Sequence, residues 1–389
     1  MKTVVVGMSG GVDSSVAALL LKQQGYRVIG LFMKNWEDTP HSVSASDTLL
    51  DEVCTSAQDY DDVARVCEKL DIPYYGIEFV KEYRELVFKN FLEEYSAGFT
   101  PNPDILCNRE IKFNLFFKKA LSLGADFLAT GHYAQNQLID GKQCLVKGVD
   151  TGKDQTYFLY TIQSQVLSQV LFPIGNLEKS KVREIAKEYG LPTHAKKDST
   201  GICFIGERNF TRFLSEYISI KPGKICTLSG QEVGTHRGIA FYTLGQRKGL
   251  GLGGEGDSWF VVGKDIQKNI LYAERGAKHP ALYADWLMAT DLTWVSGAPP
   301  LLSPDQPFRC SAKARYRQMD QSCVLYSVND ESSSEMKKVK VVFDQPQRAL
   351  TPGQSVVFYQ GTTCFGGGII RQIGPSYYEQ GRTLFTCAE

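Results

Sequence analysis

The stretch Thr3-Val4-Val5-Val6-Gly7-Met8-Ser9-Gly10-Gly11-Val12-Asp13-Ser14-Ser15 decides the fold of this chain. Its apolar beginning predicts a strand from Thr3 to Gly7, and apolar residues at helical spacing after Ser14 predict a helix. Between them, Gly10 and Gly11 allow backbone conformations in which several N–H groups converge on an anion. The free amides and the dipole of a helix N-terminus also attract anions. The stretch therefore predicts a phosphate-binding loop between a strand and a helix.

Two familiar phosphate motifs do not fit this loop. A Walker A loop needs Lys-Ser/Thr directly after its last glycine, and a dinucleotide fingerprint needs G-x-G-x-x-G, whereas Gly7, Gly10 and Gly11 satisfy neither. The pattern S-G-G-V-D-S instead resembles the PP-loop of the ATP pyrophosphatase superfamily. Members of that superfamily cleave ATP between the α and β phosphates and leave AMP on a substrate oxygen. The alternative is a glycine turn without a ligand.

Length and composition describe a globular chain of more than one domain. With 389 residues, two or three domains are expected. Lys and Arg together number 43, as do Asp and Glu, so a nucleic-acid partner would have to bind a local basic patch. Ten cysteines without a C-x-x-C pair favour reduced thiols in the cytosol over a disulfide scaffold or a zinc ribbon. Neither a signal peptide nor a membrane helix fits, so we expect a cytoplasmic protein without membrane contact.

Short apolar strands alternate with amphipathic helices over residues 1–205. This alternation predicts an α/β domain with a doubly wound, mostly parallel sheet, in which ligands gather at the carboxyl ends of the strands. The expected strands are 3–7, 28–33, 74–79 and 127–130, and the expected helices are 14–24, 59–70 and 108–123.

The pattern changes after Gly206. An apolar helical face, β-like runs and a glycine-rich stretch predict a small central domain over residues 206–280. Short β-rich runs divided by Asp, Pro and Gly turns follow in residues 281–389. They predict a small antiparallel β-barrel, with a sandwich as the alternative.

Cys107 stands directly before an expected helix, with Asn108 as its N-cap. A thiol at a helix N-terminus and beside Arg109 favours the thiolate, which makes Cys107 a candidate nucleophile. Cys203 lies between Gly201 and Gly206, which permit close approach of the backbone to a ligand. Considered alone, a cysteine in such a chain is more often a small buried apolar residue than a catalytic one.

Five motifs occur together in one order. They are G-M-S-G-G-V-D-S-S at 7–15, N-P-D-I-L-C-N-R-E-I-K-F at 102–113, G-H at 131–132, G-K-D-Q at 152–155 and S-T-G-I-C-F-I-G at 199–206. Together with the later A-R-Y-R and T-P-G-Q, they resemble the tRNA-specific 2-thiouridylase family over nearly the whole chain. The resemblance implies that ATP adenylates the C2 oxygen of the wobble uridine (U34) of a tRNA. A cysteine persulfide then delivers sulfur to C2, which gives 2-thiouridine, AMP and pyrophosphate.

The resemblance also implies roles for individual residues. Cys203 carries the persulfide, and Cys107 completes the release through a Cys107–Cys203 disulfide or by liberating sulfide. Asp104 contacts the base and serves as a general acid or base, although capping the following helix turn is an equally good role. The implied nucleotide-binding residues are Gly7, Met8, Ser9, Gly10, Gly11, Val12, Asp13, Ser14, Met33 and Gly131. The implied tRNA-binding residues are Asn102, Pro103, Asp104, His132, Lys153, Asp154, Gln155, Arg315, Tyr316 and Gln354.

Three further partners follow from this reading. ATP normally arrives with Mg²⁺, and Asp13 is expected to act on that ion or on the phosphates, with a helix-start carboxylate as its alternative role. A persulfide sulfur-donor protein, such as a cysteine desulfurase or a relay protein, is expected to supply the sulfur.

A basic strand is the expected docking surface for tRNA. Arg309, Lys313, Arg315 and Arg317 fall on one side of a period-2 strand, although a solvated strand face would give the same pattern. Phosphate contacts there predict that binding weakens steeply with salt.

Two classes of rival remain. Other PP-loop enzymes, such as a 4-thiouridine synthase, an amide-forming synthetase or a cytidine-modifying ligase, lack the paired cysteine contexts. A tRNA-binding sulfur carrier that does not use ATP would not need the loop at 9–15.

Overall fold

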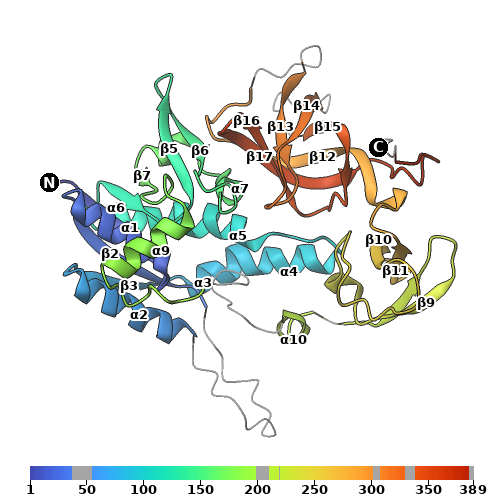
Figure 1. Cartoon of the computed structure of the whole chain (residues 1–389), viewed down its shortest axis with the longest axis horizontal. Helices are drawn as coiled ribbons and strands as arrows, with labels where there is room; N and C mark the ends of the chain where they lie inside the picture. Colours follow the sequence, from blue (N-terminus) through green and yellow to red (C-terminus); the bar gives the residue numbers. More distant parts are fainter. Residues whose placement is uncertain (37–54, 199–209, 219, 301–306, 329–337, 385–389) are drawn as a thin grey trace, which may run out of the picture.

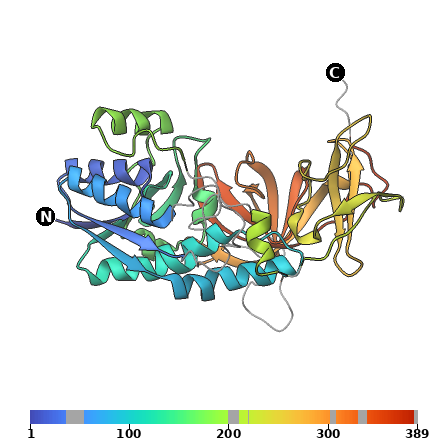
Figure 2. The same ribbon diagram turned by 90° about the horizontal axis from the view of Figure 1, so that it is seen from below.

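The computed structural model describes residues 1–36, 55–198, 210–218, 220–300, 307–328 and 338–384. These residues form three units, which Figure 1 shows in blue to green, in yellow and in orange to red. Figure 2 shows that the N-terminal unit and the middle unit lie at opposite ends, with the C-terminal unit next to both. None of the described helices has the length and apolar character that crossing a membrane requires.

The N-terminal unit is built on a five-stranded parallel sheet, with the strand order β3-β2-β1-β4-β7 among the described residues. The strand order changes direction between β1 and β4, where sheets of this kind bind their ligands. The predicted parallel sheet is thereby confirmed. The strands are β1 (Thr3–Met8), β2 (Arg27–Lys34), β3 (Tyr74–Glu78), β4 (Phe127–Ala129) and β7 (Val170–Leu171).

Helices cover both faces of this sheet, as the doubly wound prediction requires. On one face, Val4 and Val6 share a core with helices α1 (Val12–Gln23), α2 (Thr55–Lys69) and α9 (Lys179–Glu188). Val5, which points the other way, joins a second core. The elements around that second core are α3 (Val80–Tyr83), η2 (Arg84–Phe88), α4 (Lys89–Ser96), α5 (Pro103–Leu106), η3 (Cys107–Phe116), α6 (Phe117–Ser122), α7 (Thr156–Leu159) and α8 (Ser164–Leu167).

The middle unit is a four-stranded sheet with the order β10-β11-β8-β9. Its core consists of Ile225, Val261, Leu271 and a few neighbouring side chains, which is consistent with its small size. Its elements are β8 (Gly223–Cys226), β9 (Glu232–His236), η4 (Ile239–Phe241), β10 (Trp259–Asp265) and β11 (Ile270–Arg275). Helix α10 (Phe210–Ser215) precedes them in the chain, but its Phe213 and Leu214 pack in the core of the N-terminal unit.

The C-terminal unit is an antiparallel barrel, as predicted, because β12 pairs with β15 on one side and with β17 on the other. A hairpin from the N-terminal unit, β5 (Ala134–Ile139) and β6 (Lys142–Lys147), extends its sheet by pairing Val146 with Thr363. The sequence did not predict this shared sheet. The barrel elements are η5 (Pro280–Leu282), β12 (Tyr283–Trp294), β13 (Phe308–Lys313), β14 (Gln321–Val328), β15 (Lys338–Arg348), β16 (Ser355–Gln360) and β17 (Thr363–Ile373).

Candidate active site

The predicted phosphate loop joins β1 to α1 at the carboxyl edge of the sheet. Gly11 is the N-cap of α1 and provides no side-chain cap, so the first-turn amides of the helix remain available to an anion. The hydroxyl of Ser14 accepts a hydrogen bond from the Ser9 amide at 3.2 Å, and Ser15 donates to the Gly11 carbonyl at 2.8 Å. These bonds hold the loop in a shape that suits a nucleotide phosphate.

Two glycines allow other segments to approach this loop closely. Gly10 has φ +73°, and a Cβ there would lie 2.7 Å from the carbonyl oxygen of Asp59 on α2. Gly131, two residues after the end of β4, would place a Cβ 2.7 Å from the amide nitrogen of Ser14. The loop after β4 therefore touches the start of α1, which brings Gly131 to the phosphate loop. Met33, near the end of β2, is buried in the adjacent part of the sheet.

A network of charges surrounds Asp13 in the first turn of α1. The ammonium of Lys179 lies 2.8 Å from both carboxylate oxygens of Asp13 and 2.9 Å from Asp198. Asp198 also accepts from Lys153 at 2.7 Å and from Arg183 at 2.6 Å. Sequence reasoning missed Lys179 and Arg183, because α9 reads as an ordinary amphipathic helix.

The network and the burial of its surroundings shift the pKa values of Asp198 and Tyr133. Burial alone would raise the pKa of Asp198, but hydrogen bonds from Lys153 and Lys179 outweigh it and hold that pKa well below its ordinary value. Burial and the neighbouring Asp13 carboxylate raise the pKa of Tyr133, so its phenol stays protonated and donates to Asp13 at 2.8 Å. The Asp13 carboxylate is therefore held by the Lys179 ammonium and the Tyr133 hydroxyl.

The structure corrects the predicted position of Cys107. The helical run does not start at Asn108: α5 begins at Pro103 and continues into η3, and its N-cap is Asn102, whose side chain accepts from the Asp104 amide at 3.2 Å. Proline at the first helical position after an asparagine is a recognised helix start, and this signal could have located it. Cys107 is buried beyond the first turn of the run.

Arg109 is also engaged elsewhere. Its guanidinium bonds Glu110 at 2.8 Å and Asp291 of the barrel at 2.9 Å. Because the influence of a helix terminus fades within the first turn, the terminus does not favour a thiolate at Cys107, and the Arg109 guanidinium is shared by two carboxylates. Cys203 and its flanking glycines lie outside the described residues.

His132 follows Gly131, and its ring packs with two aromatic rings, Phe113 at 5.9 Å and Phe172 at 6.3 Å. Its Nδ1 lies 2.8 Å from the Thr130 hydroxyl. Burial, aided by the positive charge of Lys112, lowers the pKa of His132 well below its ordinary value. The imidazole is therefore neutral at physiological pH and can offer hydrogen bonds without carrying charge.

The G-K-D-Q motif reaches the barrel. The Tyr316 hydroxyl donates to the Lys153 carbonyl at 3.4 Å, and its ring lies 4.4 Å from that of Phe158 on α7. Gln155 and Tyr133 exchange hydrogen bonds at 2.9 Å. Asp154 is buried and accepts from Thr156 at 2.9 Å. Lys153, Gln155 and Tyr316 thus come together, whereas the Asp154 side chain points into the protein.

The α5–η3 run lies next to this group. Asn108 donates to the Phe158 carbonyl at 2.9 Å, which joins the segment of Asn102, Asp104 and Cys107 to α7. The fold therefore brings the N-P-D-I-L-C-N segment beside the G-K-D-Q region and beside Tyr316, although these lie far apart in sequence.

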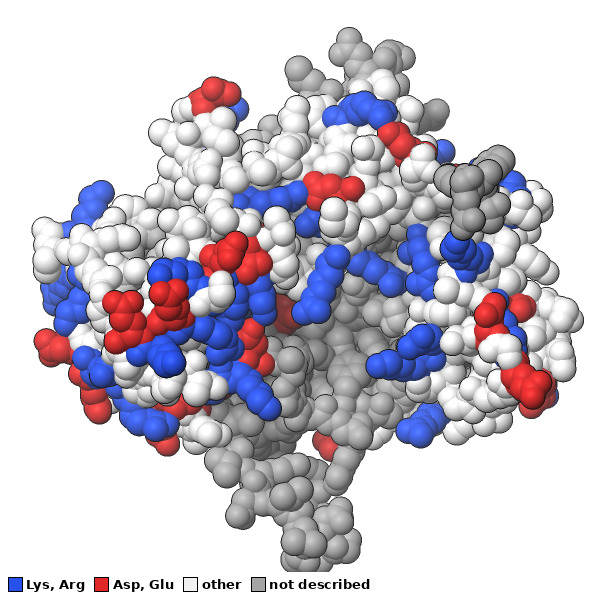
Figure 3. All heavy atoms as spheres, in the orientation of Figure 1, with Lys and Arg blue, Asp and Glu red and all other residues white. Residues whose placement is uncertain are grey.

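The predicted basic strand is wrong. Strand β13 ends at Lys313, which is buried and lies 3.6 Å from Asp154, and Arg309 pairs with Asp344. Arg315 follows the strand and donates to main-chain carbonyls inside the protein. The prediction was wrong because it continued the period-2 pattern to Arg317, whereas the strand ends at Lys313. Figure 3 instead shows Lys and Arg side chains on either side of the centre of this face of the molecule.

A protein-only magnesium site does not fit the described residues. Nowhere in those ranges do three or more His, Cys, Asp or Glu side chains form a group that could hold a metal ion. The Asp13 carboxylate already binds Lys179 and Tyr133. The donor set therefore fits Mg²⁺ only as an ion that arrives with phosphate ligands of its own.

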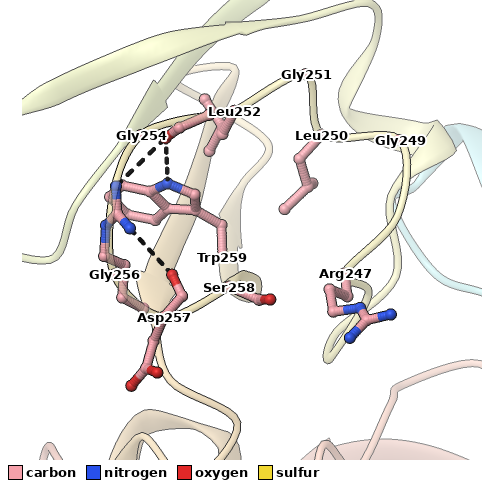
Figure 4. A pocket seen from close by; sticks show the side chains of 12 residues that line it. Arg247, Gly249, Leu250, Gly251, Leu252, Gly254, Gly256, Asp257, Ser258 and Trp259 are labelled. Carbon is pink, nitrogen blue, oxygen red and sulfur yellow. Dashed lines mark hydrogen bonds between the residues drawn. The ribbon is translucent and has the colours of Figure 1, made fainter.

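A separate pocket of about 280 Å³ lies in the middle unit and contains none of the predicted site residues. Figure 4 shows it between the loop of Gly249 to Gly256 and Trp259. Arg275 stacks on Trp259 at 4.5 Å and donates to the Gly253 and Asp257 carbonyls, so its guanidinium closes the loop.

Known families match all three units. Residues 2–207 match the family described as tRNA methyl transferase HUP domain, residues 211–275 the tRNA methyl transferase PRC-barrel domain, and residues 284–370 the Aminomethyltransferase beta-barrel domain.

Curated relatives match almost the whole chain. A "tRNA-specific 2-thiouridylase MnmA" of Protochlamydia amoebophila is 60% identical over 98% of this chain and 97% of its own. Proteins of the same description from Halalkalibacterium halodurans and Bacillus subtilis are 55% and 53% identical, over 95% and 98% of this chain and 95% and 97% of their own. The chain therefore belongs to the tRNA-specific 2-thiouridylase family of enzymes.

Proposed function

We propose that this enzyme converts the wobble uridine of tRNA to 2-thiouridine, with ATP as the activating substrate. The observation that supports the proposal most directly is the contact between Gly131 and the start of α1, because it places the G-H motif against the phosphate loop. On this reading, the residues that hold ATP are those of the loop at 7–14, with Met33 and Gly131. We also propose that the chain divides into units at 1–205, 206–280 and 281–389.

Activation of the base comes first. The C2 oxygen of uracil is a poor leaving group, so it must first be converted to an AMP ester. It attacks the α phosphorus of ATP, and pyrophosphate leaves. The amides at the start of α1 hold the phosphates. Lys179 neutralises Asp13 and Asp198 beside them. A Mg²⁺ ion that arrives with ATP would screen the charge of the phosphates.

Sulfur transfer follows at the same carbon. The terminal sulfur of a Cys203 persulfide attacks C2, and AMP leaves with the oxygen. The Cys107 thiolate then attacks the Cys203 sulfur, which breaks the S–S bond, leaves C2=S on the base and forms a Cys107–Cys203 disulfide. In the alternative route, Cys107 first releases hydrosulfide from the persulfide, and the hydrosulfide attacks C2. Either route ends in an oxidised pair that an external thiol must reduce.

The tRNA site in this proposal surrounds the α5–η3 run. Asn102, Pro103 and Asp104 face the target base, with Asp104 as the general acid or base. The N-cap of this run is Asn102, whose side chain accepts from the Asp104 amide. The proposed tRNA-binding set also includes His132, Lys153, Gln155 and Tyr316 at the site. Asp154, Arg315 and Gln354 complete the set through the segments that their side chains hold.

The base must leave its stack to reach these residues, so the pocket reads the base edge while phosphate contacts provide affinity. Salt should therefore weaken binding. The sulfur reaches Cys203 from a persulfide donor protein, such as a cysteine desulfurase or a relay protein.

One experiment tests the reaction. The protein is incubated with ATP, a persulfide donor and unmodified tRNA, and digested nucleosides are analysed by mass spectrometry. We expect 2-thiouridine only when ATP is present. Product formed without ATP would rule out adenylation and favour an ATP-independent sulfur carrier.

Two cysteine variants test the sulfur steps. A Cys203→Ser variant should still release pyrophosphate in the presence of tRNA but form no 2-thiouridine. A Cys107→Ser variant should stop turnover. Full thiolation by either variant would remove that cysteine from the mechanism.

A further inference from the structure

The segment that leads into Asn102 is held by the barrel. The Thr100 amide donates to the Pro352 carbonyl at 3.0 Å, and the Gln354 side chain donates to the Thr100 carbonyl at 2.7 Å. Both polar groups of the Thr100 main chain are therefore satisfied by one turn of the C-terminal unit. Gly353, between the two partners, has φ +91°, and a Cβ there would lie 2.7 Å from the Thr100 nitrogen.

Arg315 ties the same turn to the middle unit. Its Nη2 donates to the Ala349 carbonyl at 2.6 Å, to the Thr351 hydroxyl at 3.1 Å and to the Leu244 carbonyl at 2.9 Å. Burial lowers the pKa of Arg315, and the three oxygens that it bonds are uncharged. Because Nη2 carries two hydrogens, two of these three acceptors share one of them.

The middle unit also contacts the segment that contains Thr100. The Thr243 hydroxyl, next to Leu244, lies 3.4 Å from the Thr100 hydroxyl, and Lys264 donates to the Gly98 carbonyl at 3.2 Å. All three units thus meet at Thr100, where the chain leaves α4. Figure 1 shows α4 extending from the N-terminal unit toward the other two units.

We propose that Gln354 and Arg315 are positioning residues, which hold Thr100 and thereby set the place of Asn102 and Asp104 in the active site. Asn102 lies two residues after Thr100 and caps α5 through the Asp104 amide, so a shift at Thr100 moves the start of that helix. The barrel then contributes to the chemical step through geometry, in addition to any contact with RNA. This inference rests on the proposed role of Asp104 at the target base.

The test separates positioning from direct tRNA contact. Gln354→Met keeps the length of the side chain but removes the donor to Thr100. Gly353→Ala leaves every polar side chain in place but forces Thr100 away. Gln372→Ala, an exposed glutamine on β17 of the same barrel, is the matched control. Hydrogen exchange of residues 98–107 is measured without RNA, and thiolation kinetics and equilibrium tRNA binding are measured beside it.

We expect the amides of residues 98–107 to exchange about tenfold faster in Gln354→Met. We expect kcat to fall by roughly 10- to 100-fold, because small displacements of a catalytic group are costly. The Kd for tRNA should stay within about twofold of the wild-type value. Gly353→Ala should reproduce this pattern, and Gln372→Ala should match the wild type.

The opposite pattern would overturn the proposal: unchanged exchange in the RNA-free protein, together with a raised Kd for tRNA and an unchanged kcat. If the wild-type chain itself forms no 2-thiouridine, the proposed function fails. The positioning of Thr100 by Gln354 is then decided by the exchange rates alone.

Discussion

The ammonium of Lys179 lies 2.8 Å from both carboxylate oxygens of Asp13, although the two residues are 166 positions apart. Lys179 is buried at the start of α9, and Asp13 lies in the first turn of α1. The pair therefore joins the N-terminal ends of α1 and α9 beside the phosphate loop. A cation held there offsets the negative charge that a nucleotide triphosphate would otherwise meet at Asp13 and Asp198.

Removing this cation should impair ATP use. We expect Lys179→Met to lower kcat/KM for ATP by roughly 10²-fold, because two carboxylates near the phosphates lose their partner. Pyrophosphate release in the presence of tRNA measures the effect. Lys181→Met, an exposed lysine on the same helix, is the control and should retain full activity. Equal pyrophosphate release by Lys179→Met and the wild type would show that the bridge serves only the fold.

The contact at Gly131 should be intolerant of a methyl group. In Gly131→Ala, the new Cβ would meet the Ser14 nitrogen at 2.7 Å, so the loop after β4 must move away from α1. We expect ATP binding, measured by calorimetry, to weaken on the order of tenfold or more. Gly253→Ala is the control, because a Cβ at that position meets nothing within 4 Å. Unchanged affinity in Gly131→Ala would remove Gly131 from the nucleotide site.

The cap at Asn102 can be separated from any contact with the base. Asn102→Ala should lower the free energy of unfolding by about 1 kcal/mol, since the Asp104 amide loses its acceptor. Asn102→Ser restores a capping oxygen and should recover most of that stability. Denaturant unfolding measures both variants. If Asn102→Ser also recovers thiolation, Asn102 acts through the cap; loss of thiolation in this stable variant assigns Asn102 to the base.

Lys264 should make stability depend on pH. Burial lowers the pKa of Lys264 to about 8 from its ordinary value of 10.5. Between these values the unfolded chain binds the proton and the folded chain does not, so the free energy of unfolding should rise as pH increases from 8 to 10.5. The full shift corresponds to about 3 kcal/mol, and partial solvent exposure reduces it.

The comparison with Lys264→Met isolates this contribution. The free energy of unfolding of Lys264→Met should not rise with pH in this range. Lys268 is an exposed lysine in the turn after the same strand, and the free energy of unfolding of Lys268→Met should still rise. Denaturant unfolding at pH 8 and at pH 10 measures the difference. Parallel pH profiles for Lys264→Met and the wild type would contradict the assignment.

Local sequence signals located some elements well and misplaced others. The strand, the glycine loop and the helix at residues 3–23 follow from hydrophobic period and glycine content, and the structure agrees within a few residues. The helix start near Cys107 was misplaced because Asn108 was read as the cap, although Asn102 followed by Pro103 is the stronger signal. The basic strand failed because a period-2 pattern does not reveal where a strand ends or which lysine is buried.

The sequence by itself determined the α/β class of the first unit, its phosphate loop, the β-rich end of the chain and, through five motifs, the family. These features depend on residues that are neighbours in the chain, so periodicity and spacing reveal them. Only the tertiary structure decided that Lys179 meets Asp13, that Gly131 touches α1, that the β5–β6 hairpin extends the barrel sheet and that Gln354 holds Thr100. Each of these contacts joins segments that packing brings together, and no local pattern records a partner more than a hundred residues away.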